Sequence, residues 1–165
     1  MTTDEFMAAM RTIAATPVDV FALLADPARH RETEPGDWVR DAVAPQPITG
    51  VGQVFVINMF HPASPGDGHY VMHNVVTEFD QDRVIAWRPG QLDESGQVRT
   101  GGWLWRYELA APNIAPTGSP RTDVTLTYDW SHTPDPVRRE IGGLPPFEPG
   151  FLDESLASLE RAVTQ

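Results

Sequence analysis

The stretch that decides the fold is Trp103-Leu104-Trp105-Arg106-Tyr107-Glu108-Leu109, followed by Val124-Thr125-Leu126-Thr127-Tyr128-Asp129-Trp130. In each segment every second residue is large and apolar, and most of the residues between are polar. A period of two is typical of a β-strand that is covered on one face only. In an antiparallel sheet the other face meets water. We therefore predict an antiparallel sheet whose covered face carries several aromatic rings.

Further strands are predicted before and between these segments, because sixteen prolines and thirteen glycines divide the chain into short pieces joined by turns. Periodicity alone leaves 5–15 open between helix and strand, and we predict a strand. Six consecutive strands are predicted over 38–46, 52–61, 69–80, 83–89, 102–111 and 122–132. Turns are placed at Pro89-Gly90 and in a loop that holds Pro112 and Pro116. Short connections imply an antiparallel meander.

Two short helices are predicted between the first two strands. Thr16 is placed to cap the first helix and Pro17 occupies its first position. Asp26-Pro27 ends this helix and begins a second one that continues through Arg31, before Gly36 ends the unit.

The last third of the chain returns to helical patterns. Thr133-Pro134 begins a short helix that Gly142 ends, and a proline-rich bend leads into a final helix. In that helix apolar residues recur at i, i+4, i+7 and i+11, at Leu152, Leu156, Leu159 and Val163. This apolar stripe must be buried, and the aromatic face of the sheet is expected to receive it.

Composition excludes several classes of protein. The 165 residues suit a single domain, predicted over 1–165, and the absence of cysteine excludes disulfides and thiolate chemistry. The net charge is −11 and the twelve cations are scattered arginines, which argues against binding nucleic acid or anionic membranes. No apolar run is long enough for membrane insertion, and Asp4 and Glu5 are unlike a secretory signal. We expect an acidic cytoplasmic protein.

The sequence also argues against metal and nucleotide chemistry. His69 and His73 lie on one predicted strand, where four residues span about 13 Å, too far for two ligands of one ion. His30, His61 and His132 occur singly and are predicted to have surface or capping roles. No glycine-rich phosphate loop and no nucleophilic serine motif is present. We expect neither a metal site nor a cofactor.

The aromatic face has two possible roles. Tryptophan and tyrosine fill a core, but their N–H and O–H groups also suit the wall of a small-molecule pocket, and the residues leave both readings open. In the segment 69–80 neither face is cleanly polar. His73 or Asn74 could orient a ligand there, form an internal hydrogen bond, or simply be exposed to solvent.

The order of elements resembles the helix-grip fold of the START-related superfamily (SRPBCC), and in particular its bacterial polyketide cyclase/dehydrase-like branch. The resemblance spans essentially the whole chain and rests on residues 14–21, 76–80, 83–87, 105–109 and 122–130. It implies an α+β fold in which a curved seven-stranded antiparallel sheet closes around a long C-terminal helix, with a hydrophobic cavity between them. Members of the superfamily range from carriers to cyclases, so the fold alone assigns no reaction.

Three functions follow as hypotheses. The first is binding of an apolar or aromatic small molecule by a monomer or homodimer. The residues predicted to face the ligand are Trp87, Trp103, Trp105, Tyr107, Tyr128, Phe60, Met72, Asn74 and His73. The second is a cyclase, aromatase or dehydratase in which Tyr107, Tyr128 or His73 moves a proton, although no catalytic residue is assigned. The third is a non-enzymatic interaction module, as in the chaperone-activator relatives.

Overall fold

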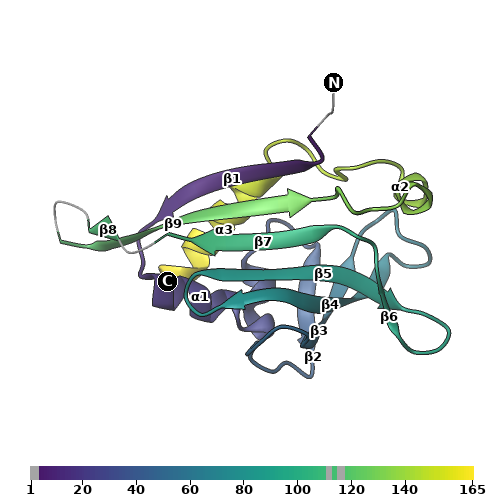
Figure 1. Ribbon diagram of the computed structural model, residues 1–165, viewed down its shortest axis with the longest axis horizontal. Coiled ribbons are helices and arrows are strands. Elements are labelled where there is room, and N and C mark those ends of the chain that lie inside the picture. The colour runs from purple at the N-terminus through teal and green to yellow at the C-terminus, as the bar shows by residue number, and fades with distance from the viewer. Residues whose placement is uncertain (1–3, 111–112, 115–117) are drawn as a thin grey trace.

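The two aromatic segments form strands β7 (Leu104–Leu109) and β9 (Pro120–Asp129), which are neighbours in an antiparallel sheet (Figure 1). The structure is a computed structural model that describes residues 4–110, 113–114 and 118–165. The sheet has the strand order β1-β9-β7-β5-β4-β3-β2. The remaining strands of this path are β1 (Phe6–Ile13), β2 (Val39–Val43), β3 (Val54–Phe60), β4 (His69–Asp80) and β5 (Val84–Leu92). The predicted meander from the second strand onward is confirmed, and β1 joins it beside β9.

Two short strands were not predicted. Strand β6 (Val98–Thr100) pairs with β5, and β8 (Asn113–Ile114) pairs with β9, so the described residues form nine strands and the predicted count of seven is too low. The predicted turn at Pro89-Gly90 is also wrong, because β5 continues through it. A Cβ at Gly90 would lie 2.6 Å from the backbone oxygen of Arg99, so glycine is needed there for the approach of β6. Residue 111 of the predicted strand, with Pro112 and Pro116, lies outside the described residues.

Two helical elements separate β1 from β2, as predicted. Helix α1 (Pro17–Leu24) begins after Thr16, whose Oγ1 accepts a hydrogen bond of 3.1 Å from the backbone N–H of Asp19. The second element, η1 (Pro27–Glu32), is a 3₁₀ helix. The C-terminal part contains α2 (Asp135–Ile141) and α3 (Phe151–Val163).

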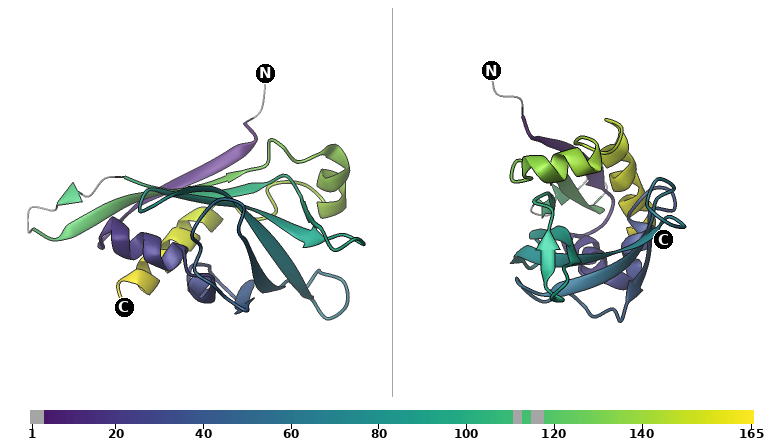
Figure 2. Two further views of the ribbon diagram at one scale, coloured as in Figure 1. Left: turned by 60° about the horizontal axis from the view of Figure 1, so that its bottom comes forward. Right: turned by 90° about the vertical axis from the view of Figure 1, so that its right-hand side faces the viewer.

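The sheet curves, and α1 and α3 lie on its inner, concave side (Figure 2). The stripe of α3 is buried at Leu152, Leu156 and Leu159, whereas Val163 is only partly buried. On β7, Tyr107 is buried on the same side. The predicted contact between the apolar stripe and the covered face of the sheet is therefore present.

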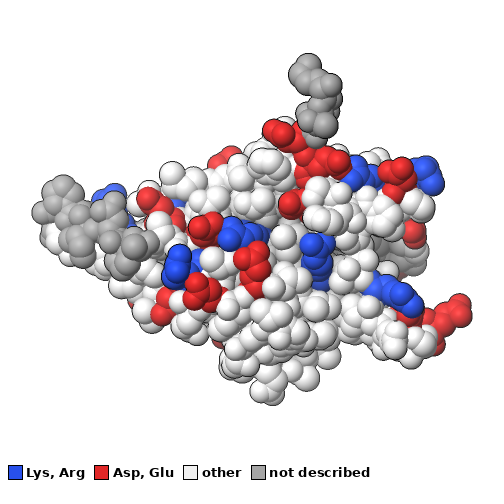
Figure 3. All heavy atoms as spheres, in the orientation of Figure 1, with Lys and Arg blue, Asp and Glu red and all other residues white. Residues whose placement is uncertain are grey.

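Basic and acidic side chains are interspersed over the outer face of the sheet (Figure 3). Arg106 of β7 donates hydrogen bonds to Glu78 at 3.0 Å and to Glu108 at 2.7 Å. Among the described residues, no helix is both long enough and apolar enough to cross a membrane.

A β-bulge explains the mixed faces of the segment 69–80. In β4 the register with β5 shifts between Val76 and Glu78. Before the shift Asn74 and Val76 are buried, whereas after it Glu78 pairs with Arg106 on the outer face. Phe79 turns inward instead, with its ring centroid 5.4 Å from that of Phe21. A simple alternation cannot describe both halves of this strand.

Candidate functional site

A cavity of about 1020 Å³ lies between the concave face of the sheet, the segment after η1 and the segment that joins α2 to α3. Its lining is dominated by apolar and aromatic side chains. The aromatic residues among them are Trp38, Phe55, Tyr70, Trp87, Trp103, Trp105, Tyr128, Phe147 and Phe151. Such a volume and lining are typical of a small-molecule site.

The burial of the lining residues shows where the cavity opens. Asn74 and Trp87 are buried and form its floor. The exposed lining residues come instead from the β3–β4 loop, at 61–65, and from the α2–α3 segment, at 141–148. The mouth therefore lies between two segments that are far apart in the sequence.

Aromatic rings in contact form one wall. The centroid of Trp105 lies 4.6 Å from that of Tyr128 and 5.7 Å from that of Phe147. Phe147 in turn lies 4.6 Å from Phe151, and Phe151 lies 5.5 Å from Trp38. Rings at these separations attract one another, so the wall connects the sheet, α3 and the segment before β2.

Two polar groups that line the cavity have internal partners. Trp38 donates a hydrogen bond of 2.7 Å from Nε1 to the hydroxyl of Tyr70, and burial raises the pKa of Tyr70. Asn74 donates from Nδ2 to the backbone oxygens of Phe55 at 3.3 Å and Met72 at 3.4 Å. These bonds fix the directions of the side chains around the cavity.

Glu34 brings a carboxyl group to this apolar site. It follows η1, lines the cavity and accepts a hydrogen bond of 2.6 Å on Oε2 from the Ser155 hydroxyl of α3. The hydroxyl of Tyr107 is a second hydrogen-bond partner of the carboxyl. Burial raises the pKa of Glu34 from its usual 4.5 to about 7, although both hydroxyls act in the opposite direction. The group can therefore exist in either protonation state near neutral pH.

Tyr107 is the residue that pairs with Glu34. Burial, followed by the nearby Glu34 carboxyl, raises its pKa well above 10.0, so the phenol keeps its proton and donates. Burial likewise raises the pKa of Tyr128.

His30 lies on the floor of the cavity, so of its two predicted roles, surface or capping, the surface role is wrong, whereas its hydrogen bond to the last residue of α1 agrees with the capping role. Its ring stacks on Trp87, with centroids 5.2 Å apart, and meets Phe55 edge-on at 5.2 Å. Nε2 donates to the backbone oxygen of Leu24 at 2.7 Å, since that oxygen can only accept. Burial lowers the pKa of His30, so the ring is neutral.

Six of the nine residues predicted to face a ligand line the cavity. They are Trp87, Trp103, Trp105, Tyr128, Met72 and Asn74. Ligand binding by these residues stays a prediction.

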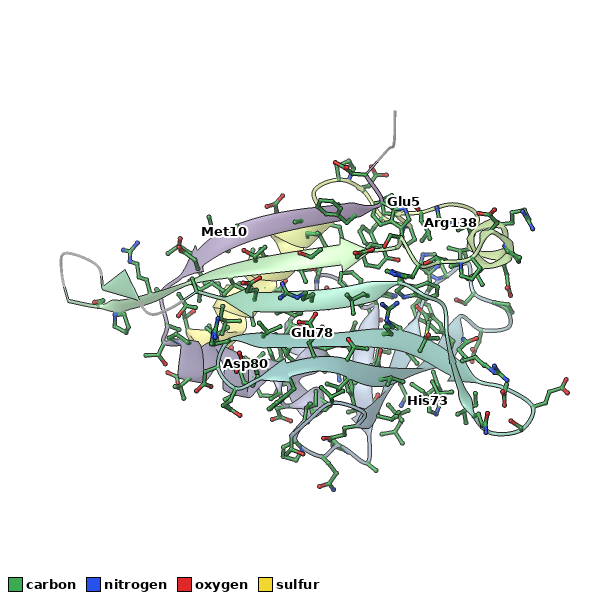
Figure 4. All side chains as sticks on the ribbon, in the orientation of Figure 1. Glu5, Met10, His73, Glu78, Asp80 and Arg138 are labelled. Atoms are coloured by element: carbon green, nitrogen blue, oxygen red, sulfur yellow. The ribbon has the colours of Figure 1, made fainter. Side chains whose placement is uncertain are left out.

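The other three predicted placements are corrected. Tyr107 lies behind the wall, 2% exposed, and reaches the site through Glu34. Phe60 follows Met59, which lines the cavity, so Phe60 points to the opposite face, where the Arg40 guanidinium lies 4.4 Å from its ring centroid. His73 lies between Met72 and Asn74 on β4 and is turned away from the cavity by the same alternation (Figure 4).

Sequence reasoning missed Glu34, Trp38, Tyr70 and Phe147. Glu34 lies in the irregular stretch Thr33-Glu34-Pro35-Gly36, where no periodicity assigns a side to a residue. Its position depends on Ser155, which is distant in sequence. Within the described part of the chain, no group of three or more His, Asp or Glu residues could hold a metal ion.

Comparisons with known proteins support the fold and assign no activity. No protein-family model matches the sequence. The chain is 27% identical over 154 residues to the uncharacterized protein MT0096 of Mycobacterium tuberculosis, covering 93% of this chain and 58% of that protein. It therefore spans little more than half the length of the curated relatives that it matches.

Solved structures resemble the chain over nearly its whole length. Protein CV1439 from Chromobacterium violaceum superposes with a TM-score of 0.64 and 18% identity, covering 98% of each chain. The Aha1 dimer from Colwellia psychrerythraea gives a TM-score of 0.54 and 17% identity, covering 96% of this chain and 95% of that one. The class defined by these likenesses is an α+β protein with an open antiparallel sheet and a C-terminal helix.

Proposed function

We propose that the protein binds an apolar or aromatic small molecule in the cavity between the sheet and α3, as in polyketide cyclase-like proteins of the START-related helix-grip superfamily. The observation that carries the proposal is the cavity of about 1020 Å³. A core built for stability alone is close-packed, whereas a large concave space lined mainly by apolar side chains and open to solvent at one mouth is typical of a small-molecule site.

The walls support the same proposal. Trp105, Tyr128 and Phe147 offer ring surface to a ligand while packing against one another. Trp105 and Tyr128 are buried, so little of this wall needs to be ordered when a ligand enters, which favours affinity. The mouth between 61–65 and 141–148 gives access from solvent. We propose that the binding form is a monomer or a homodimer.

Filling the cavity tests this proposal. Met72 lines the cavity, whereas its neighbour Val71 is 39% exposed on the opposite face of β4. Met72→Trp should occupy the space and weaken binding of an environment-sensitive apolar dye about tenfold or more, and Val71→Trp should leave binding unchanged. Fluorescence titration measures both affinities. Equal affinities for the two variants and the unmodified protein would place dye binding outside the cavity.

Mass spectrometry of the denatured protein provides a second test, because a retained ligand is released on unfolding. Absence of a copurifying molecule, together with a dye that does not bind, would contradict the proposal.

An alternative function is a cyclase, aromatase or dehydratase. The observation that favours it is the contact of Glu34, whose pKa is about 7, with Tyr107 beside the cavity, because a carboxyl group with such a pKa can exchange protons at neutral pH. Turnover of an identified substrate that disappears in Glu34→Gln would support catalysis. A substrate that is bound and released unchanged would support binding alone.

A further inference from the structure

The charges around the cavity have one sign. None of the described residues that line it is an arginine, although the chain has twelve, whereas Glu34 and Glu148 both line it. The net charge of the whole chain is −11. An anionic ligand would meet no fixed positive side chain there.

The protein itself does not neutralise the charge of Glu34. Its hydrogen-bond partners, Ser155 and Tyr107, are neutral hydroxyl groups. None of the ion pairs between described residues includes Glu34. Glu34 is partly shielded from water, and a shielded carboxylate without a counter-ion is costly, so a cation that enters the cavity would be stabilised by it.

The aromatic walls favour the same charge. The faces of indole rings carry partial negative charge and attract organic cations, most strongly where water is excluded. Trp38, Trp87 and Trp105 all line the space that Glu34 borders. The cavity thus combines apolar surface, electron-rich rings and one unpaired carboxyl group.

We propose that the ligand is an apolar or aromatic molecule that carries one basic nitrogen, and that its protonated nitrogen pairs with Glu34. This inference rests on the proposed function, since it names the class of ligand for that cavity. The other titratable groups that line the cavity are His30, His61, Tyr70, Tyr128 and Glu148.

Three probes with the same ring separate the charge from the apolar contribution: 1-pyrenemethylamine, 1-pyrenemethanol and 1-pyrenecarboxylate. Titration at about pH 8, followed by pyrene fluorescence, gives three dissociation constants. The ammonium probe should bind at least about tenfold more tightly than the alcohol, and the carboxylate more weakly than the alcohol. An alcohol or carboxylate that binds as tightly as the ammonium probe would overturn the inference while leaving the proposed function intact.

Two variants test whether the preference for the ammonium probe over the alcohol depends on Glu34. Glu34→Gln should remove the advantage of the ammonium probe and retain binding of the alcohol. Glu140→Gln makes the same change of charge on α2, outside the cavity, and should preserve the advantage. If both variants kept it, the pairing with Glu34 would be wrong. If no probe bound the unmodified protein, the proposed function would be contradicted, and the inference with it.

Discussion

The two ends of the concave face are built from the same strands but are filled differently. At one end, Leu109 of β7 and Val124 of β9 are buried in the hydrophobic core that also contains residues of α1 and α3. At the other end the same strands present Trp105 and Tyr128, which border the cavity. Tyr107 lies at the boundary, buried in the core with its hydroxyl bonded to Glu34.

This difference shows how one sheet can both pack a hydrophobic core and border a cavity. Branched aliphatic side chains fill space closely and leave no polar atom to satisfy, which suits the end that α3 covers. Rigid aromatic rings can support one another across a gap, which suits the end where helix coverage stops. A change of residue type along a strand therefore marks the border of the cavity.

The largest effect is expected from truncating the filled end. Leu156 of α3 is completely buried, so Leu156→Ala should lower the free energy of unfolding by about 2–5 kcal/mol. Leu144 is partly exposed and lines the cavity, so Leu144→Ala should cost less than about 1.5 kcal/mol. Denaturant titration measures both. Equal losses in the free energy of unfolding would show that the two ends of the concave face are packed alike.

Protonation of Glu34 should have the next largest effect. Because its pKa in the folded state is about 7, above the usual 4.5, the native state holds this proton more tightly than the unfolded chain. Its contribution to stability is complete below 4.5 and is lost as the pH rises through about 7. Relative to Glu34→Gln, the unmodified protein should lose up to about 3 kcal/mol between pH 4.5 and 8.

The use of Glu34→Gln as the reference cancels the titration of neighbours such as His30 and Tyr107. Denaturant titrations of both proteins across this range provide the comparison. Parallel stability curves would mean that the carboxyl group is not held in a buried, proton-retaining position.

The smallest effect is expected on the outer face. Arg106 also pairs with Glu108 at 2.7 Å, so it should retain a partner when Glu78 is changed, and both acids are substantially exposed. Glu78→Gln should therefore cost less than about 1 kcal/mol, and added salt should reduce the difference further. A loss comparable to that of Leu156→Ala would show that this ion pair contributes far more than water-exposed pairs usually do.

Much of this architecture could be predicted from the sequence because it depends on local patterns. The alternation around Trp105 and Tyr128 predicted which sides of β7 and β9 are covered, and the leucine spacing predicted the buried side of α3. The cap at Thr16 could also be predicted from the sequence, since its hydrogen bond spans only three residues.

The remaining features depend on contacts between distant segments. The bulge at Val76 and Glu78 is a misfit between two strands, so the sequence of β4 alone does not specify it. Most of the predicted aromatic lining could be found because it lies on patterned strands. Glu34 could not, because its position depends on Ser155, 121 residues away, and on Tyr107.

The mouth of the cavity has a consequence for the rates of binding. Its rim comes from 61–65 and 141–148, whereas the floor comes from buried residues such as Trp87 and Asn74. If a molecule binds as proposed, contacts with the buried floor would set how tightly it is held, and the exposed rim would set how quickly it enters and leaves. Substitutions in the rim would then change the residence time of the ligand without disturbing the packed end of the sheet.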